Sequence, residues 1–249
     1  MLKINEKIFE NFFDSPYKGD KVNVLFCGMI CRIILPFILI WSVVFSTVCA
    51  SAANTSTDKV KENILDAIEK KYTGKSFEAS FTQSVTLVAI DNTQKASGKA
   101  SFSHPGKMRW EYLEPERHEI ITNGSSLWIY RPELNQVMQS DTASFFKPGS
   151  GGDFLSDISL VRKNYIISIK AVTAEYVEIK LISKQETHNF SSIVIRISQK
   201  NSEIERVFSY NTYDDTTTLF EFSDIQFKEI DPAIFEFNPP ERSDIIKMD

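Results

Sequence analysis

Apolar and polar residues alternate along most of the second half of the chain and much of the first. In the earliest of these runs, Phe77, Ala79 and Phe81 are each separated by one polar residue. A period of two is typical of a β-strand with one buried face and one solvent-facing side. Similar runs predict a series of strands, which are expected over residues 77–87, 99–103, 108–112, 118–122, 125–130, 136–139, 165–170, 175–183, 190–198, 204–210 and 216–227.

The clearest turn in the pattern is Asn123-Gly124, which lies between two apolar runs. Asn and Gly adopt positive φ more readily than other residues, and the favoured two-residue hairpin turns require it. His104-Pro105-Gly106 predicts a second turn, because proline keeps the preceding residue extended and glycine allows the reversal. Neighbouring strands joined by short turns are expected to pair antiparallel.

One helix is expected before the strands. Ile64, Ile68 and Tyr72 fall at helical spacing and form part of a single apolar stripe. The stripe predicts a helix over Asp58–Tyr72, and Gly74 is expected to end it.

Two segments show neither the alternation of a strand nor the spacing of a helix. Residues 54–57 are polar and are expected to lack structure, with Ser56 or Thr57 capping the helix that follows. Between residues 140 and 164 the alternation disappears, so short helices or a mobile apolar loop are expected there. A short turn of helix is expected at Asp231-Pro232.

Together these elements predict a mainly β fold. A sheet of about ten or eleven strands must curl or close, because large twisted sheets do not stay flat. We expect a single strongly curved antiparallel sheet, or an incomplete β-barrel of about eleven strands, with helices as a lid.

The N-terminal residues predict export. Residues 33–48 form an uncharged apolar run, with Arg32 before it and Ala50-Ser51-Ala52 after it. A charged start, an apolar middle and a small-residue end are typical of a secretory signal peptide. A retained membrane anchor is the alternative, since the run is near the shortest length that spans a bilayer.

These features divide the chain into two parts. Residues 1–52 are assigned to a leader and signal peptide, with Met29 as an alternative start of translation, and residues 53–249 to a single domain. All three cysteines lie in the leader. An exported domain without cysteine must form a stable core without disulfides.

Charge and composition exclude several functions. The chain has 28 Lys and Arg against 33 Asp and Glu, so a nucleic-acid surface is not expected. His104, His118 and His188 lack the spacing of a metal site. The sequence also lacks the nucleophile-elbow and phosphate-loop motifs. It therefore predicts neither an enzyme nor a cofactor or metal site.

Large apolar side chains are abundant, and Phe alone occurs 19 times. They fit an ordinary β-barrel core, or a cavity for an apolar ligand beneath the helical lid. The inward face of Ser125–Tyr130 stays open, because both of its faces carry apolar residues. The candidate cavity and lid residues are Ile64, Ile68, Tyr72, Phe77, Phe81, Phe102, Met108, Trp110, Tyr112, Phe145, Phe146, Phe154 and Leu155.

Short motifs follow one another along the chain in a characteristic order. They are Phe77-Glu-Ala-Ser-Phe-Thr-Gln83, Gly98, Pro105 with Trp110 and Pro115, Asn123-Gly-Ser-Ser-Leu-Trp-Ile-Tyr130, Gln136-Val137 and Phe235-Glu-Phe-Asn-Pro-Pro240. In this order and spacing they resemble the LolA family of periplasmic lipoprotein carriers. The resemblance implies an incomplete barrel lidded by helices, a cavity for lipoprotein acyl chains, and no catalysis.

The resemblance also implies partners and a compartment. Members of the family take outer-membrane lipoproteins from an inner-membrane ABC transporter and give them to an outer-membrane acceptor. We therefore expect a periplasmic protein, monomeric, without cofactor or nucleic-acid partner. A carrier of another lipid or glycolipid, and a lipid-sensing regulatory protein, are the alternatives.

His104 departs from the family pattern. The family often has an arginine directly before the proline that matches Pro105, and this arginine is linked to lid contacts and cargo release. Arginine is always charged and carries five donors, whereas histidine is mostly neutral near pH 7. The role therefore does not transfer directly. His104 is the candidate gate, with an ordinary pre-proline turn residue as the alternative.

Overall fold

The computed structural model describes residues 48–142, 157–184, 192–211 and 216–248, with side chains described from Thr57 onward. The helices are α2 (Val48–Tyr72) and α5 (Leu160–Asn164), with 3₁₀ turns η1 (Val88–Ile90), η2 (Pro132–Leu134) and η3 (Pro232–Phe235). The strands are β1 (Ser76–Leu87), β2 (Asn92–Ser103), β3 (Lys107–Glu114), β4 (His118–Asn123), β5 (Ser126–Arg131), β6 (Gln136–Asp141), β7 (Tyr165–Val172), β8 (Tyr176–Ser183), β9 (Ser192–Ser198), β10 (Ile204–Asn211), β11 (Thr216–Phe227) and β12 (Asp244–Lys247).

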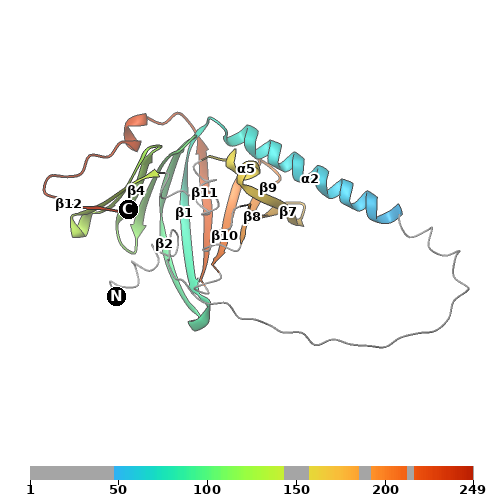
Figure 1. Ribbon diagram of the computed structural model, residues 1–249, viewed down its shortest axis with the longest axis horizontal. Coiled ribbons are helices and arrows are strands. Elements are labelled where there is room, and N and C mark those ends of the chain that lie inside the picture. The colour runs from blue at the N-terminus through green and yellow to red at the C-terminus, as the bar shows by residue number, and fades with distance from the viewer. Residues whose placement is uncertain (1–47, 143–156, 185–191, 212–215, 249) are drawn as a thin grey trace, which may run out of the picture.

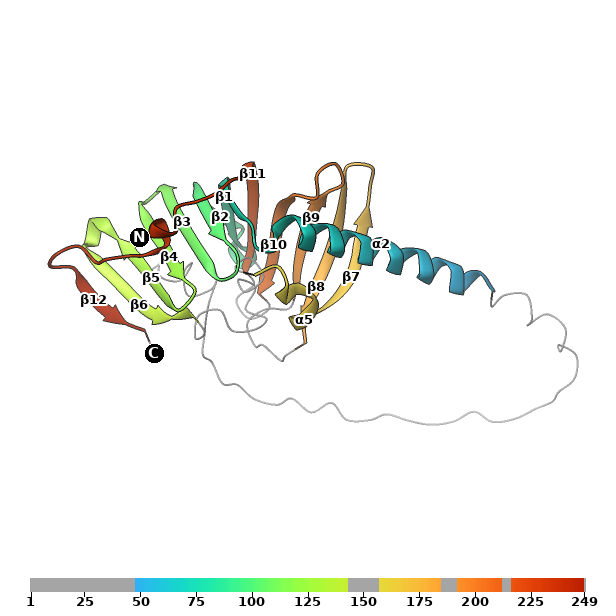
Figure 2. The same cartoon turned by 90° about the horizontal axis from the view of Figure 1, so that it is seen from above.

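The described strands form one curved sheet (Figures 1 and 2). Its order is β12-β6-β5-β4-β3-β2-β1-β11-β10-β9-β8-β7, so β7 and β12 are the edges and the sheet does not close within the described chain. The neighbours pair antiparallel except β12, which runs parallel to β6. The mainly β, curved and open sheet predicted from the alternation is confirmed.

Most strands begin and end close to the predicted positions, but two differences are informative. β2 begins at Asn92, seven residues before the predicted start, because its first half pairs with the end of β1 in a hairpin that extends beyond the core. β12 was not predicted. Its residues are exposed, and without a buried face a strand need not alternate.

The Asn123-Gly124 turn connects β4 and β5 as predicted. Gly124 has a φ of +95°, which is readily available to glycine. The Asn123 side-chain oxygen accepts hydrogen bonds from the backbone N–H groups of Ser125 and Ser126, at 3.0 and 2.9 Å. The side chain thus stabilises the reversal that the sequence indicated.

The first helix is longer than predicted. It runs from Val48 to Tyr72, so the expectation that residues 54–57 lack structure and that Ser56 or Thr57 caps the helix is wrong. Its end is as predicted: Gly74 follows with a φ of +65°. Among the described helices, none is both long and apolar enough to cross a membrane. The division into leader and domain stays a prediction.

The sheet buries side chains on both faces. The inner face, defined here as the face that α2 covers, contributes most of a large apolar cluster that spans β1 to β11. On the outer face, Ile121, Trp128 and Val137 form a smaller cluster with Phe237. Leu127 and Ile129 belong to the inner cluster, which settles the orientation that the sequence left open.

The chain after β11 crosses the outer face towards β12 (Figure 2). Asp231 accepts a hydrogen bond from the Ala233 N–H at the start of η3, which confirms the predicted short turn of helix. The Phe235 side chain is fully buried, and Arg109 Nη1 donates to the Ile234 carbonyl at 3.0 Å. We call residues 231–247 the C-terminal strap.

Candidate functional site

The strand residues expected to line a cavity lie together on the inner face. Phe77 and Phe81 on β1, Phe102 on β2, and Met108, Trp110 and Tyr112 on β3 are all buried in the same apolar cluster. The Phe81 ring meets both Trp110 and Tyr112 edge-on, with centroids 4.9 Å apart in each pair. Such edge-on contacts stabilise the packing of the three rings.

The helix residues expected in the lid are buried in the same apolar cluster. Ile64, Ile68 and Tyr72 on α2 are buried in the inner cluster, as is Leu65, which was not among the predicted site residues. The Tyr72 hydroxyl accepts a hydrogen bond from the Ile204 N–H at 2.9 Å. Burial raises the pKa of Tyr72, so this hydroxyl stays protonated. The end of α2 is thereby fixed to β10.

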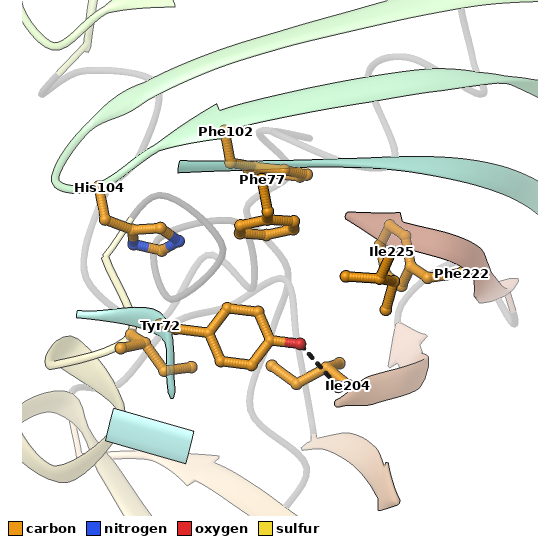
Figure 3. Close-up of a pocket in the computed structure, with 8 residues that line it drawn as sticks. Tyr72, Phe77, Phe102, His104, Ile204, Phe222 and Ile225 are labelled. Atoms are coloured by element: carbon orange, nitrogen blue, oxygen red, sulfur yellow. Dashed lines mark hydrogen bonds between the residues drawn. The ribbon is translucent and has the colours of Figure 1, made fainter. Parts of the chain in front are cut away.

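A small pocket lies where the end of α2 meets the sheet (Figure 3). Its volume is about 20 Å³, which is room for about one water molecule and not for an acyl chain. An acyl chain would fit in this pocket only if the residues that line it moved apart. The pocket is lined by Tyr72, Phe77, Phe102, His104, Ile158, Ile204, Phe222 and Ile225.

Half of these lining residues were missed from the sequence. Ile204, Phe222 and Ile225 lie on predicted strands, but only the pairing of β1 with β11 brings that part of the sheet beside Phe77. Ile158 lies in the segment without a clear period. The predicted lid residues Phe145, Phe146, Phe154 and Leu155 lie outside the described residues.

His104 is the one ionisable group among the lining side chains besides Tyr72. Its ring stacks on Phe77, with centroids 5.9 Å apart, and Figure 3 shows it pointing into the pocket between Phe77 and Tyr72. The backbone N–H of His104 donates to the Lys75 carbonyl at 3.2 Å. Its Nδ1 is buried and has no hydrogen-bond partner in the described part of the chain.

The pKa of His104 reflects this apolar environment. Burial lowers it from 6.5 to about 4, against a smaller opposing effect of the Asp157 carboxylate. The imidazole is therefore neutral near pH 7. A neutral ring with an unpaired nitrogen is the single polar feature that can respond to pH inside this pocket.

The described side chains offer little chemistry. Residues 57–142, 157–184, 192–211 and 216–248 contain no group of His, Asp and Glu placed to hold a metal ion. Around the pocket, the groups that face one another are aromatic and aliphatic. The lining of the pocket thus favours contacts between apolar groups.

A comparison with known families agrees with this geometry. Residues 73–238, about two thirds of the chain, match the family described as outer membrane lipoprotein carrier protein LolA. The chain belongs to the LolA family. Members of the LolA family are carriers that bind cargo, so membership favours a binding protein over an enzyme.

Two curated LolA relatives cover most of the chain. The outer-membrane lipoprotein carrier protein of Nitrosomonas europaea is 29% identical over 175 residues, which are 69% of this chain and 82% of the relative. The outer-membrane lipoprotein carrier protein of Methylococcus capsulatus is 26% identical over 206 residues, which are 80% of this chain and 91% of the relative. An uncharacterized conserved protein from Thermus thermophilus has a similar structure, with a TM-score of 0.51 at 12% identity, covering 76% of this chain and 99% of that one. This last likeness supports the fold alone.

Proposed function

We propose that this LolA family member carries outer-membrane lipoproteins through the periplasm and holds their acyl chains against the inner face of the sheet. The observation that carries the proposal is the aromatic surface of Phe81, Trp110 and Tyr112, buried on the inner face in the same apolar cluster as the apolar side of α2. The names of the curated relatives support the choice of lipoprotein as cargo. No covalent step is involved.

The small volume of the pocket shapes the mechanism. Each acyl CH₂ that leaves water contributes about 0.8 kcal/mol. In the proposed cycle, an acyl chain displaces α2 and the segment around Ile158 from the inner face and takes over their contacts. Because one set of apolar contacts replaces another, the net free energy of binding stays small, and the cargo can be released again.

His104 is the proposed gate of this pocket. Its neutral ring is compatible with an apolar chain beside Phe77. Protonation would place a charge in the same space, where desolvation makes charge costly, and would weaken the hold on the acyl chain. The lone Nδ1 also offers the pocket's free hydrogen-bonding site to the polar end of the cargo.

The proposed partners follow from the carrier role. An inner-membrane ABC transporter that releases lipoproteins would load the protein, and an outer-membrane acceptor would unload it. A monomer suits this exchange, because the inner face must be reached by one cargo molecule at a time. The periplasm is the proposed compartment, in keeping with the apolar run and the small-residue site at the N-terminus.

A pair of β1 variants tests the binding face. Phe81 faces inward and is buried, whereas its neighbour Thr82 is exposed on the outer side. Phe81→Glu should lose capture of a fluorescent fatty acyl probe, and Thr82→Glu should retain it. Trp110→Glu is the second inward variant, and circular dichroism checks the folding of all three. Unchanged capture by both inward variants would contradict the proposal.

A further inference from the structure

Two described helices meet beside the pocket. α2 ends at Tyr72, and α5 begins two residues after Ile158; both residues line the pocket. α5 lies next to the C-terminal half of α2 (Figure 1). Ile158 and Val161 anchor this segment in the inner cluster, each about 1% exposed. The separation of α5 from α2 would therefore open the pocket from one side.

A single arginine connects the two helices. All three nitrogen positions of the Arg162 guanidinium are used: Nε donates to Glu69 at 2.6 Å, Nη1 to Glu62 and Nη2 to Asp66. The three acceptors are spaced by four and three residues along α2, which places them on one face of the helix. We call this group the Arg162 clasp.

The other end of α5 is attached to the sheet. The Lys184 ammonium donates to the carbonyl oxygens of Arg162 and Lys163, at 2.8 and 3.1 Å, where a helix terminus leaves carbonyls unpaired. α5 has only five residues, too few to be stable alone. Its position thus depends on Lys184, on two buried apolar side chains and on the Arg162 clasp.

We propose that Arg162 is a positioning residue that holds α5 against α2 and so controls how readily the pocket opens. One cation faces three carboxylates, so loss of Arg162 leaves like charges at helical spacing, where they repel. The Arg162 side chain is 32% exposed, and the Asp66 side chain is 74% exposed. Salt therefore screens the clasp, and opening should become easier as ionic strength rises.

The nearby charges do not replace Arg162. Lys61 lies 4.0 Å from Glu62 but belongs to α2 itself, so it cannot connect α2 to α5, and its shorter contact is with Asp58 at 2.9 Å. Lys71 pairs with Glu203 at 3.1 Å. Lys184 uses its donors on backbone carbonyls. Among the described side chains, the Arg162 clasp is thus a direct polar link between α5 and α2. Its role in cargo handling rests on the proposed function, whereas its effect on α5 does not.

The test compares wild type with Arg162→Gln, Arg162→Lys and the control Arg196→Gln. Arg196 forms a similar partly buried ion pair with Glu178, at 2.7 Å, but this pair connects β9 to β8 and includes no residue of α2 or α5. Hydrogen exchange of residues 158–164 is measured without ligand at low and high salt. Release of a bound fluorescent fatty acyl probe is measured under the same conditions.

In Arg162→Gln, exchange of α5 and release of the probe should both rise about two- to fivefold at low salt, and their salt dependence should disappear. Arg162→Lys should recover only part of the effect, since one ammonium cannot reproduce the three-way fork of a guanidinium. Arg196→Gln should behave as wild type in both measurements.

Two results would overturn the proposal. The first is unchanged hydrogen exchange of α5 in Arg162→Gln. The second is faster exchange of α5 with unchanged release of the probe, which would mean that the clasp stabilises α5 but does not affect the pocket. A wild-type protein that captures no acyl probe would instead contradict the proposed function. The hydrogen-exchange measurement needs no ligand, so it would still test whether Arg162 holds α5 against α2.

Discussion

Trp110 and Trp128 are buried to nearly the same extent but on opposite faces of one sheet. Trp110 on β3 is 6% exposed and belongs to the inner cluster, whereas Trp128 on β5 is 8% exposed and belongs to the outer cluster. Trp110 packs against Phe81, and Trp128 packs against Phe237 of the C-terminal strap. The two indoles therefore report separately on the two faces.

This pair gives a spectroscopic prediction. In a chain with Trp41→Phe, the variant Trp128→Phe leaves Trp110 as the only indole, and Trp110→Phe leaves Trp128. A brominated fatty acid quenches an indole that it touches. Binding should quench the emission of Trp110 strongly and leave that of Trp128 unchanged. Equal quenching of both, or quenching of Trp128 alone, would place the ligand elsewhere.

His104 predicts a pH dependence of stability. Burial lowers the pKa of His104 from 6.5 to about 4. Between these two pH values, the unfolded chain therefore binds a proton at His104 that the folded chain does not. The stabilisation is complete above pH 6.5 and is lost as the pH falls towards 4, by up to about 3 kcal/mol. His104→Phe should keep the ring packing against Phe77 and reduce this loss, measured by denaturant unfolding at several pH values.

His118 is the matched control for His104. Burial also lowers its pKa to about 4, but its ring stacks on Tyr112, with centroids 4.0 Å apart, and it does not line the pocket. His118→Phe should reduce the acid loss of stability too, without changing the pH dependence of probe release. If His104→Phe also releases the probe with the wild-type pH dependence, His104 is not a gate.

Gly98 is predicted to tolerate no side chain. A Cβ there would lie 1.9 Å from the Glu111 carbonyl oxygen on β3 and 3.0 Å from the Phe81 ring. Backbone cannot move aside cheaply in a paired strand, so Gly98→Ala should cost at least about 1–3 kcal/mol. Ala96→Gly, in the same strand, is the control and should cost less than about 1 kcal/mol. Unfolding midpoints for Gly98→Ala equal to those of the control would contradict the close approach.

Phe235 is predicted to secure the C-terminal strap. It is fully buried, and η3 packs against β3 and β4. Phe235→Ala should lower the free energy of unfolding by about 3–5 kcal/mol, because it leaves a cavity in place of a large ring. Since the strap lies on the outer face, capture of the acyl probe by the folded protein should be unchanged. Loss of capture in a fully folded Phe235→Ala protein would link the strap to the binding face.

The sequence was most informative where a buried face imposes a period. The alternation of β1 and the turn at Asn123-Gly124 were sufficient to predict a curved antiparallel sheet, and the inward positions of Phe81 and Trp110 follow from the same alternation. The alternation of apolar and polar residues is absent where neither face of a strand is buried. The exposed first half of β2 and the whole of β12 therefore have no periodic pattern to detect.

Only half of the residues that line the pocket could be predicted from the sequence, because most of the others depend on the order of the strands in the sheet. Phe77 and Tyr72 could be chosen by type and local spacing. Ile204 and Phe222 line the pocket because distant strands become neighbours in the sheet order, which local periodicity does not encode. The helix start was misjudged because the polar residues 54–57 are weak helix formers singly, yet continue a helix that has already begun at Val48.

The most direct measurement of the central claim is mass spectrometry of the protein purified from the periplasm with whatever it holds. We expect the wild-type protein and Thr82→Glu to carry an acylated lipoprotein, and we expect Phe81→Glu to have lost it. A purified protein that carries no acylated molecule, and is bound instead to a membrane signalling protein, would contradict it.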